Sequence, residues 1–439
     1  MKEIESRHNE SRSNFANRKL NRLSEINSNQ GIKFSHSMAE PGSHCPMHTA
    51  LAVTQRVKGV SSLVVGMPEC GFYSRYVMDQ PVGKHGELHY VYVLDSNEVV
   101  FGCRDGLQEA LRIMIQDGAE AIMVIMTCIP ALIGEDIKEI TEEINAETSA
   151  KAVCIDMAHF KRNGYESGFY EVYQALLSLQ QNNKQMETHQ VNLLGSLLGN
   201  EGVRLKEILT ENGFQTVELG GSFSLEDMGV ITAGRLNIVI SIHMLPLARS
   251  LEKEYDIPYI FLGAGYSIDD ITELYQSIFN ALEIKECVSQ FQSYEHIQSL
   301  LQEKAGSFNN LPYIATAVIP DVLGVCAFLG TLSMKPLLLH VEEYNEWMKE
   351  WKTEILAMGQ NPYTTYITKR ESVAQLLEQV DKEDNLPLLS LGSLKGVPGC
   401  CSVDDRKVRQ FGSLIGYERT HQLLNTILHS LEESEDAII

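Results

Sequence analysis

The chain has 439 residues, a formal net charge of −22, and hydrophobic and charged contents of 44% and 21%, which are ordinary for a globular protein. A single hydrophobic core rarely grows beyond about 250–300 residues, so this length predicts two or three domains. The negative charge argues against nucleic acid or an anionic membrane as the main partner, because both would be repelled.

The start of the chain and its longest apolar run both argue against a secreted or membrane-spanning protein. Residues 1–30 are polar and rich in Asn, Ser and Arg, without the apolar stretch of a signal peptide. The longest apolar run, 121–134, has 14 residues, fewer than the ~20 needed to cross a bilayer. We expect a cytoplasmic protein whose nine cysteines are reduced thiols or metal ligands rather than a disulfide framework.

Short apolar runs alternate with helical stretches along the whole chain. The runs predict strands at 61–66, 121–126, 152–156, 191–195, 236–241, 259–263, 313–318, 336–340 and 386–391. Between them, apolar residues recur at i, i+3 and i+4 and predict helices at 107–116, 136–147, 203–212, 247–255, 342–358 and 421–431. This alternation predicts an α/β fold with parallel sheets.

Two breaks divide this pattern into three blocks. The polar segment 180–190 is typical of a linker, and 286–310 combines a helix with a Gly-, Ser- and Asn-rich loop. The breaks predict an N-terminal extension at 1–34, a first domain at 35–185, and Rossmann-like domains at 186–305 and 306–404. The last two share a weak internal echo, 212–217 against 332–337, which common ancestry and shared folding rules explain equally well.

Two cysteines follow predicted strands at the edge where α/β sheets bind ligands. Cys70 follows the strand 61–66 in Gly-Met-Pro-Glu-Cys-Gly-Phe-Tyr, and Cys128 follows 121–126 in Thr-Cys-Ile-Pro-Ala-Leu-Ile-Gly-Glu-Asp. Cys45 precedes Pro46, which is well placed as a first helical residue. A helix N-terminus favours a thiolate over a thiol and suits an anionic cluster.

The spacings between these cysteines, 25 and 58 residues, match no local metal motif of the Cys-x-x-Cys type. Free cysteines often act as small core hydrophobes, and spacing alone does not exclude that role. Flanking Pro and Gly residues favour a site, since core packing at a strand end does not require Cys. His44 and His48 flank Cys45 and would suit zinc with Cys70, but a zinc site would leave Cys128 without a role.

These segments resemble the nitrogenase component 1 family, which includes nitrogenase molybdenum–iron protein subunits, cofactor-assembly scaffolds, and protochlorophyllide and nickel-sirohydrochlorin reductases. The resemblance rests on Cys45, Gly-x-Pro-x-Cys70-Gly-Phe-Tyr-Ser and Thr-Cys128-x-x-x-Leu-Ile-Gly-Glu-Asp, the last being most specific. Weaker matches at 95–111, 191–195, 236–258 and 416–418 extend it over about residues 35–435. It implies three Rossmann-like domains, with the C-terminal helix in 405–439 returning to the first.

The resemblance also implies an iron–sulfur cluster, 4Fe–4S or larger, held by Cys45, Cys70 and Cys128 at a subunit interface. Such clusters commonly take four thiolates, so an identical or homologous chain would supply the remaining ligands. Electrons would come from a P-loop ATPase partner with its own cluster, since this chain contains no Gly-x-x-x-x-Gly-Lys-Ser/Thr. The expected activity is low-potential reduction of a small molecule, such as a tetrapyrrole. A cluster-assembly scaffold without turnover and a structural or electron-relay subunit are the alternatives.

The match weakens where nitrogenase proper holds its second, larger cofactor through a Cys and a His. The corresponding neighbourhoods here contain Ser241, with His243 close by, and Ile415 before the late Gly-Tyr. Neither ligand is present at its matched position, so dinitrogen reduction is not expected.

Four other residues are candidates for catalysis or for a second metal cofactor. Cys400 and Cys401 lie in a Gly- and Pro-rich segment after the strand 386–391, His243 could act as a ligand or acid, and Arg75 could attract an anionic substrate. The structural alternatives are an exposed loop position for the two cysteines, a buried position for His243 and a surface ion pair for Arg75. Four further cysteines are predicted to be structural: Cys103, Cys154, Cys287 and Cys326.

Overall fold

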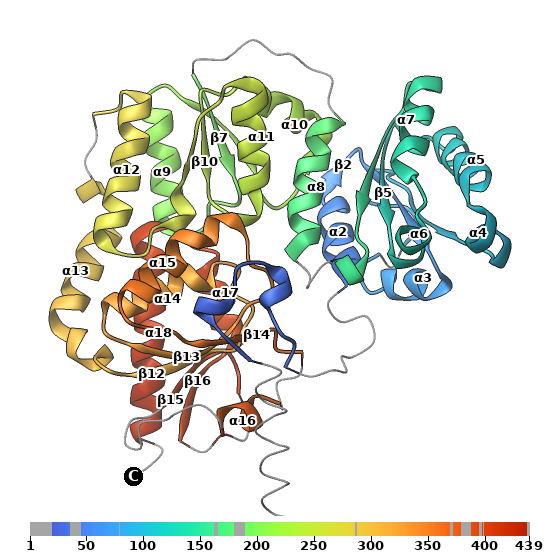
Figure 1. Ribbon diagram of the computed structural model, residues 1–439. Helices are drawn as coiled ribbons and strands as arrows, with labels where there is room; N and C mark the ends of the chain where they lie inside the picture. The colour runs from blue at the N-terminus through green and yellow to red at the C-terminus, as the bar shows by residue number, and fades with distance from the viewer. Residues whose placement is uncertain are drawn as a thin grey trace, which may run out of the picture. The chain divides into compact units, whose positions relative to one another are not determined.

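The computed structural model describes residues 20–35, 45–78, 80–161, 166–179, 189–285, 288–368, 372–378, 388–394, 397 and 399–436. Contacts divide the chain into a terminal unit of Met1–Ser43, Leu197–Glu207 and Leu262–Ile439, and a middle unit of His44–Ser196 and Ile208–Phe261. Three largely parallel sheets follow one another along the chain, as predicted (Figure 1). The domain boundaries at 34/35, 185/186, 305/306 and 404/405 stay predictions, and most of the proposed linker, 180–188, lies outside the described residues.

The first sheet lies in the middle unit and is parallel throughout. Its strands, in order across the sheet, are β4 (His89–Val93), β3 (Ser61–Gly66), β5 (Ala121–Met126) and β6 (Lys151–Asp156). The strands predicted at 61–66 and 121–126 are confirmed, and that at 152–156 begins one residue earlier. The sheet grows outward in both directions from β3, so the carboxyl ends of β3 and β5 form its topological switch point.

Amphipathic helices cover the first sheet. Helices α5 (Arg104–Gln116) and α7 (Ile137–Glu147) bury their apolar residues against one face of the strands, and α2 (Pro46–Thr54) and α8 (Glu166–Ser178) contact β3, β5 and β6 (Figure 1). In α5, Leu107, Leu111 and Met114 recur at helical spacing and are fully buried. Each such side chain contributes roughly 1.5–3 kcal/mol by leaving water.

The second sheet also belongs to the middle unit. Its strands, in order, are β11 (Tyr259–Phe261), β10 (Leu236–Val239), β7 (Gln190–Leu194) and β8 (Gln215–Leu219), all parallel. The strand predicted at 191–195 is confirmed one residue earlier, and those at 236–241 and 259–263 are confirmed as shorter strands. The helix predicted at 247–255 is α11 (Leu245–Tyr255). A short parallel pair, β2 (Val57–Lys58) with β9 (Phe223–Ser224), joins two loops of this unit.

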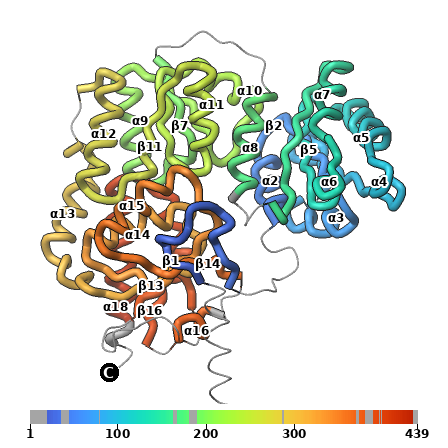
Figure 2. The backbone as a smooth tube through the Cα atoms, in the orientation of Figure 1, coloured from blue at the N-terminus to red at the C-terminus, as the bar shows by residue number. Residues whose placement is uncertain are grey.

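The third sheet lies in the terminal unit. In order, its strands are β1 (Asn21–Arg22), β14 (Tyr363–Thr365), β13 (Lys335–His340), β12 (Pro312–Ala315), β15 (Leu388–Leu391) and β16 (Cys400–Val403). The predictions at 313–318, 336–340 and 386–391 are confirmed with altered ends. Strand β1 is antiparallel to β14 and lies beside it (Figure 2). The described end of the predicted polar extension is therefore part of a sheet.

The C-terminal helix α18 (Gly416–Asp436) includes the helix predicted at 421–431. It packs against α12 (Ile268–Leu282), α13 (Gln292–Lys304), α17 (Asp405–Gly412) and β16, all in the terminal unit. Its apolar side, formed by Leu423, Leu424 and Ile427, is fully buried. The return of this helix to the first domain, which the resemblance implies, stays a prediction.

Helix α14 (Val322–Thr331) is apolar all round but only 10 residues long. Most of its side chains are buried, which is typical of a helix inside a protein core. Over the described residues, we find no helix with the combined length and apolarity that a membrane span requires.

The internal echo between 212–217 and 332–337 has a structural explanation. Both segments leave a helix through a left-handed residue, Gly213 with φ 83° and Ser333 with φ 62°, before the second strand of a sheet. In both, the next backbone N–H bonds back into the helix, from Phe214 at 2.9 Å and from Met334 at 3.1 Å. The same left-handed turn recurs before three other strands, at Gly118, Asp256 and Gly359. The similarity of the two segments therefore comes from a common way of ending a helix. This favours shared folding rules over common ancestry as its explanation.

Candidate metal centre

Each of the three predicted cysteine ligands lies at the start of a helix in the middle unit. Cys45 is the N-cap of α2, Cys70 is the third residue of α3 (Pro68–Ser74), and Cys128 is the first residue of α6 (Cys128–Ile133). Helix α3 follows β3 and α6 follows β5, which are neighbouring strands. Cys70 and Cys128 therefore lie on the two sides of the switch point of the first sheet.

Cys70 and Cys128 lie near enough to Cys45 to affect the ionisation of its thiol. Burial raises the pKa of the Cys45 thiol to about 11, and the charges of Cys128 and Cys70 add to this rise, while the Met47 backbone acts in the opposite direction. All three cysteines are partly exposed. With so high a pKa, the Cys45 thiol stays protonated at neutral pH unless a cation binds it, because a metal displaces the proton of its ligand.

Neighbouring groups fix two of the three sulfur atoms. The Cys70 thiol donates to the Thr127 hydroxyl, with 3.4 Å between Sγ and Oγ1, and that hydroxyl donates to the Val65 carbonyl at 2.8 Å. The backbone N–H of His159 donates to Cys128 Sγ at 3.2 Å. The contacts of Thr127 and His159 with the cysteine sulfurs were not predicted from the sequence. For Thr127, its position directly before Cys128 in the motif could have indicated such a contact.

Glycine is required at the end of β3 for a steric reason. A Cβ atom on Gly66 would lie 2.2 Å from Thr127 Oγ1 and 2.9 Å from Cys70 Sγ. Both distances are well inside van der Waals contact, so any side chain here would displace Cys70.

The most specific motif, Leu-Ile-Gly-Glu-Asp after Cys128, consists largely of helix caps. Gly134 ends α6 in the left-handed conformation, with φ 83°. The Glu135 carboxylate accepts the backbone N–H of Cys103 at 3.1 Å, where α5 begins, and Asp136 accepts that of Glu139 at 3.0 Å, where α7 begins. The motif therefore joins the helix of Cys128 to two helices of the same sheet.

Cysteine thiolates are ligands both of zinc ions and of iron–sulfur clusters. Across the described ranges, no three His, Cys, Asp or Glu side chains form a group that could hold one metal ion. A tetrahedral zinc ion needs sulfur atoms within about 3.8 Å of one another, whereas a cluster binds each thiolate at a different iron. The cluster and the zinc alternative with His48 both stay predictions, and His44 lies outside the described residues.

An exposed apolar patch adjoins the helix of Cys128. It consists of Val100 and Phe101 at the end of α4 (Ser96–Phe101) and Leu132 and Ile133 at the end of α6, and α4 contacts α6. Phe101 is 85% exposed and Leu132 is 66% exposed. Apolar residues gathered on a surface mark interaction sites, so this α4–α6 patch is a candidate docking surface.

The structure places Cys400 and Cys401 differently from the sequence prediction. They begin strand β16 and pair with Leu388 and Leu389, the first residues of the parallel strand β15. The pair therefore lies at the amino end of the third sheet and not in a loop at its carboxyl end. Cys401 is buried and Cys400 packs against a hydrophobic cluster, as a structural role requires.

His243 and Arg75 also lie in the middle unit. The His243 ring stacks on Phe169, with 4.4 Å between ring centroids, and meets the edge of Tyr170 at 5.3 Å. This packing favours the structural alternative for His243. Arg75 ends α3 and lines a groove of about 750 Å³ together with Phe72 and other residues of α3 and β4.

Of the remaining described cysteines, Cys103 and Cys326 are buried and Cys154 is partly exposed. Burial raises the pKa of Cys103, Cys154 and Cys326 to about 12 in each case. Cys287 lies outside the described residues.

Three largely parallel sheets, with Cys70 and Cys128 on the two sides of the switch point of the first, define an α/β protein. The sequence pattern of the nitrogenase component 1 type oxidoreductases matches residues 45–432, and the chain belongs to this family. The resemblance stated from the cysteine motifs is thereby confirmed.

Several known proteins are similar to this chain. It is 27% identical over 196 residues to the nitrogenase iron-molybdenum cofactor biosynthesis protein NifE of Bradyrhizobium diazoefficiens, covering 43% of this chain and 36% of that protein. It is 20% identical over 384 residues to one of the subunits of the light-independent protochlorophyllide reductase of Pyropia yezoensis, covering 77% and 72%. The matches to NifE proteins and to an archaeal nitrogenase alpha chain span only 36–40% of the length of those relatives.

The fold is also that of a solved structure described as "Nitrogenase Cp1 at pH 6.5". The two superimpose with a TM-score of 0.65 over 91% of this chain and 94% of the other, at 15% identity. An identity this low shows the shared fold alone.

Proposed function

We propose that this chain is one subunit of a nitrogenase-like iron–sulfur reductase, with Cys45, Cys70 and Cys128 as the cluster ligands on its side of a subunit interface. The observation that carries the proposal is the gathering of three thiols, each at a helix N-terminus, around the switch point of the first sheet. Membership of an oxidoreductase family supports redox chemistry at this edge.

When bound, a 4Fe–4S or larger cluster would supply low-potential electron transfer. The chain's own residues hold and tune the three sulfurs. Cys45, Cys70 and Cys128 lie at the starts of α2, α3 and α6, and the His159 N–H donates to Cys128 Sγ. Thr127 positions Cys70 from the neighbouring strand.

The partners in this proposal are a second component 1 chain, identical or homologous, and a P-loop ATPase reductase as electron donor. Three thiols leave a cluster short of the usual four, which supports ligands from a second chain. The α4–α6 patch beside Cys128 is an apolar surface that a protein partner would cover.

The proposed substrate is a small unsaturated molecule such as a tetrapyrrole, which the similarity to a protochlorophyllide reductase supports. Reduction of dinitrogen is not proposed. The Ser241 hydroxyl accepts the backbone N–H of His243. Ile415 is fully buried and its side chain has no atom that could bind a metal. Neither position therefore supplies the Cys or His ligand. A reducing compartment such as the cytoplasm would keep the thiols free.

The second candidate function is a scaffold that holds a nascent cluster and catalyses no turnover. The match to NifE, a cofactor biosynthesis protein, favours it specifically. The two functions share the ligand site and differ in whether bound substrate is reduced.

The decisive experiment is anaerobic purification of the full chain, followed by iron and sulfide analysis and EPR. Wild type is compared with Cys128→Ala and with the control Cys154→Ala. Cys154 lies on β6 of the same sheet, and its side chain packs against the hydrophobic core. We expect Cys128→Ala to lose most of the iron and the EPR signal, and Cys154→Ala to keep both. Iron content unchanged in Cys128→Ala would overturn the ligand assignment. Transfer of the cluster to an acceptor protein, without substrate reduction, would select the scaffold.

A further inference from the structure

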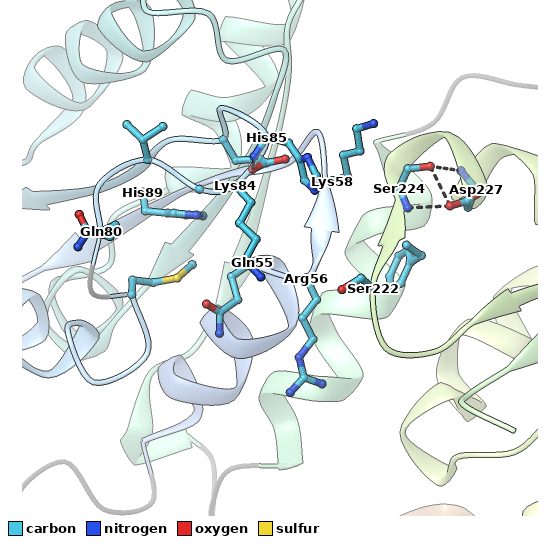
Figure 3. A pocket seen from close by; sticks show the side chains of 15 residues that line it. Gln55, Arg56, Lys58, Gln80, Lys84, His85, His89, Ser222, Ser224 and Asp227 are labelled. Carbon is cyan, nitrogen blue, oxygen red and sulfur yellow. Dashed lines mark hydrogen bonds between the residues drawn. The ribbon is translucent and has the colours of Figure 1, made fainter. Parts of the chain in front are cut away.

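A pocket of about 620 Å³ lies in the middle unit, away from the cysteines (Figure 3). Its walls are the end of α2 with β2, the segment 80–89 that leads into β4, and the segment 222–227 around β9. The parallel pairing of β2 with β9 joins two of these walls. Because Lys58 precedes β3 and His89 begins β4, the pocket lies at the amino edge of the first sheet.

The cysteines lie at the opposite, carboxyl edge of this sheet. Strand β3 has six residues, which span about 20 Å at roughly 3.3 Å per residue. A small molecule in the pocket would therefore not touch the proposed cluster ligands.

Five basic side chains line the pocket: Arg56, Lys58, Lys84, His85 and His89. Figure 3 shows Arg56 and Lys84 between the segment that carries His89 and the segment that carries Ser222 and Ser224. This concentration is unusual in a chain with 36 Lys and Arg against 58 Asp and Glu.

Two carboxylates line the pocket among the described residues, and both already accept hydrogen bonds from other groups. Glu87 accepts the backbone N–H groups of Gly59 and His85, each at 3.1 Å. Burial disfavours its charge, but these bonds outweigh burial and hold the pKa of Glu87 below its ordinary value. Asp227 accepts the N–H of Ser224 at 2.7 Å and its hydroxyl at 2.8 Å.

The Arg and Lys side chains of the pocket differ from these two carboxylates in their pairing with described residues. Throughout the described part of the chain, no ion pair joins Arg56, Lys58 or Lys84 to a carboxylate. Among the described lining residues, three full positive charges therefore accompany two carboxylates whose oxygens bind backbone and hydroxyl groups. This excess of positive charge favours the binding of an anion from solution.

Uncharged groups complete the lining. The Nδ1 atom of His89 hydrogen-bonds the Ser62 hydroxyl at 2.9 Å, which fixes the ring. Burial lowers the pKa of His89, so at neutral pH the ring is a hydrogen-bond partner and not a charge. A Cβ on Gly83 would lie 3.1 Å from His89 Nε2 and 2.7 Å from the Glu87 carboxylate, so glycine keeps this side open.

We infer that this pocket binds a small molecule with two or more negative charges, carried by phosphate or carboxylate groups. Arg56 and Lys84 come from separate walls of the pocket, so a ligand with two or more anionic groups matches them better than a single monovalent ion. The pocket volume lies in the range of about 300–1,000 Å³ typical of small-molecule sites. This site does not depend on the proposed cluster function.

The test is isothermal titration calorimetry of the full chain at low salt, with inorganic pyrophosphate and citrate as separate probes. We expect at least one probe to bind with one site per chain. Arg56→Gln and Lys84→Gln should each weaken that binding about tenfold, because each removes a charge-assisted hydrogen bond. Lys138→Gln is the matched control, since Lys138 is 78% exposed on α7 and pairs with Glu142.

The two probes show whether phosphate or carboxylate groups carry the negative charge of the ligand. Tighter binding of pyrophosphate would identify a phosphorylated ligand, and tighter binding of citrate a polycarboxylate; both support the site. Absence of binding by both probes, or equal affinity in wild type, Arg56→Gln and Lys84→Gln, would overturn it. Urea unfolding of each variant checks that the fold is unchanged.

Discussion

Glu201 and Glu418 cap each other's helices, although 217 residues separate them. The Glu201 carboxylate accepts the backbone N–H groups of Tyr417 at 3.0 Å and Glu418 at 2.7 Å, in the first turn of α18. In return, the Glu418 carboxylate accepts the N–H of Glu201 at 2.9 Å, in the first turn of α9 (Gly199–Glu211). Each carboxylate satisfies N–H groups that a helix start leaves unpaired, and its charge complements the helix dipole.

Replacing Glu201 with Gln should destabilise the protein by about 1–3 kcal/mol. The Glu201 carboxylate accepts from three donors, the third being the Tyr275 hydroxyl at 2.7 Å, and Gln offers only one acceptor oxygen. Urea unfolding measures the change. The control is Glu207→Gln on the same helix, where the side chain is 54% exposed and forms a surface pair with Arg204. That change should stay within about 0.5 kcal/mol. Equal losses in the two variants would contradict the capping role.

The same carboxylate should make stability depend on pH. Burial raises the pKa of Glu201 from 4.5 to about 7, although hydrogen bonds from Tyr275, Glu418 and Tyr417 oppose the rise. The native state therefore binds more protons than the unfolded chain between these values, and its stability falls as the pH rises through them. From pH 6 to pH 8 we expect this group to remove about 1 kcal/mol of unfolding free energy. Glu201→Gln should lose that part of the slope, and an unchanged slope would refute the assignment.

Gly416 should tolerate no side chain. Its φ of 53° is left-handed, and a Cβ atom would lie 2.0 Å from the Glu201 carboxylate. Gly416→Ala should therefore cost about 2 kcal/mol or more, from backbone strain and the displaced cap. Gly412→Ala is the control, since a Cβ there meets nothing within 4 Å. Thermal unfolding compares the two, and similar midpoints would show that the Gly416 site relaxes freely.

The central strands could be predicted because burial on both faces leaves a continuous apolar run. Every residue of β3 is buried, and so are five of six in β5. Strand β4 was missed because it is a half-exposed edge strand with polar flanks. Helix α14 was missed because it is apolar all round, which removes the helical period that identifies an amphipathic helix.

The site could be predicted in part for the same reason. Cys70 and Cys128 follow two buried strands, and the strand order makes those strands neighbours. The position of Cys401 was wrong because the register of β16 on β15 depends on tertiary pairing that no local pattern encodes. The caps between Glu201 and Glu418 were beyond prediction for a similar reason, since they join distant parts of the chain.

Thr127 offers a test of how the proposed ligand Cys70 is positioned. Its hydroxyl accepts from Cys70 and donates to the Val65 carbonyl, and both bonds are lost in Thr127→Val, which keeps nearly the same volume. We expect that variant to lose about 1 kcal/mol of stability without iron. After anaerobic loading, it should also release iron faster to a chelator and show a broadened EPR signal.

Thr127→Ser is the matched control for this prediction, because it keeps the hydroxyl and loses only a methyl group. We expect its iron retention and EPR signal to match wild type, since the bond to Cys70 is preserved. A purely structural role for Thr127 would lower stability in Thr127→Val while leaving the signal of the loaded protein unchanged. Identical iron release from the Val and Ser variants would likewise show that the hydroxyl does not position Cys70.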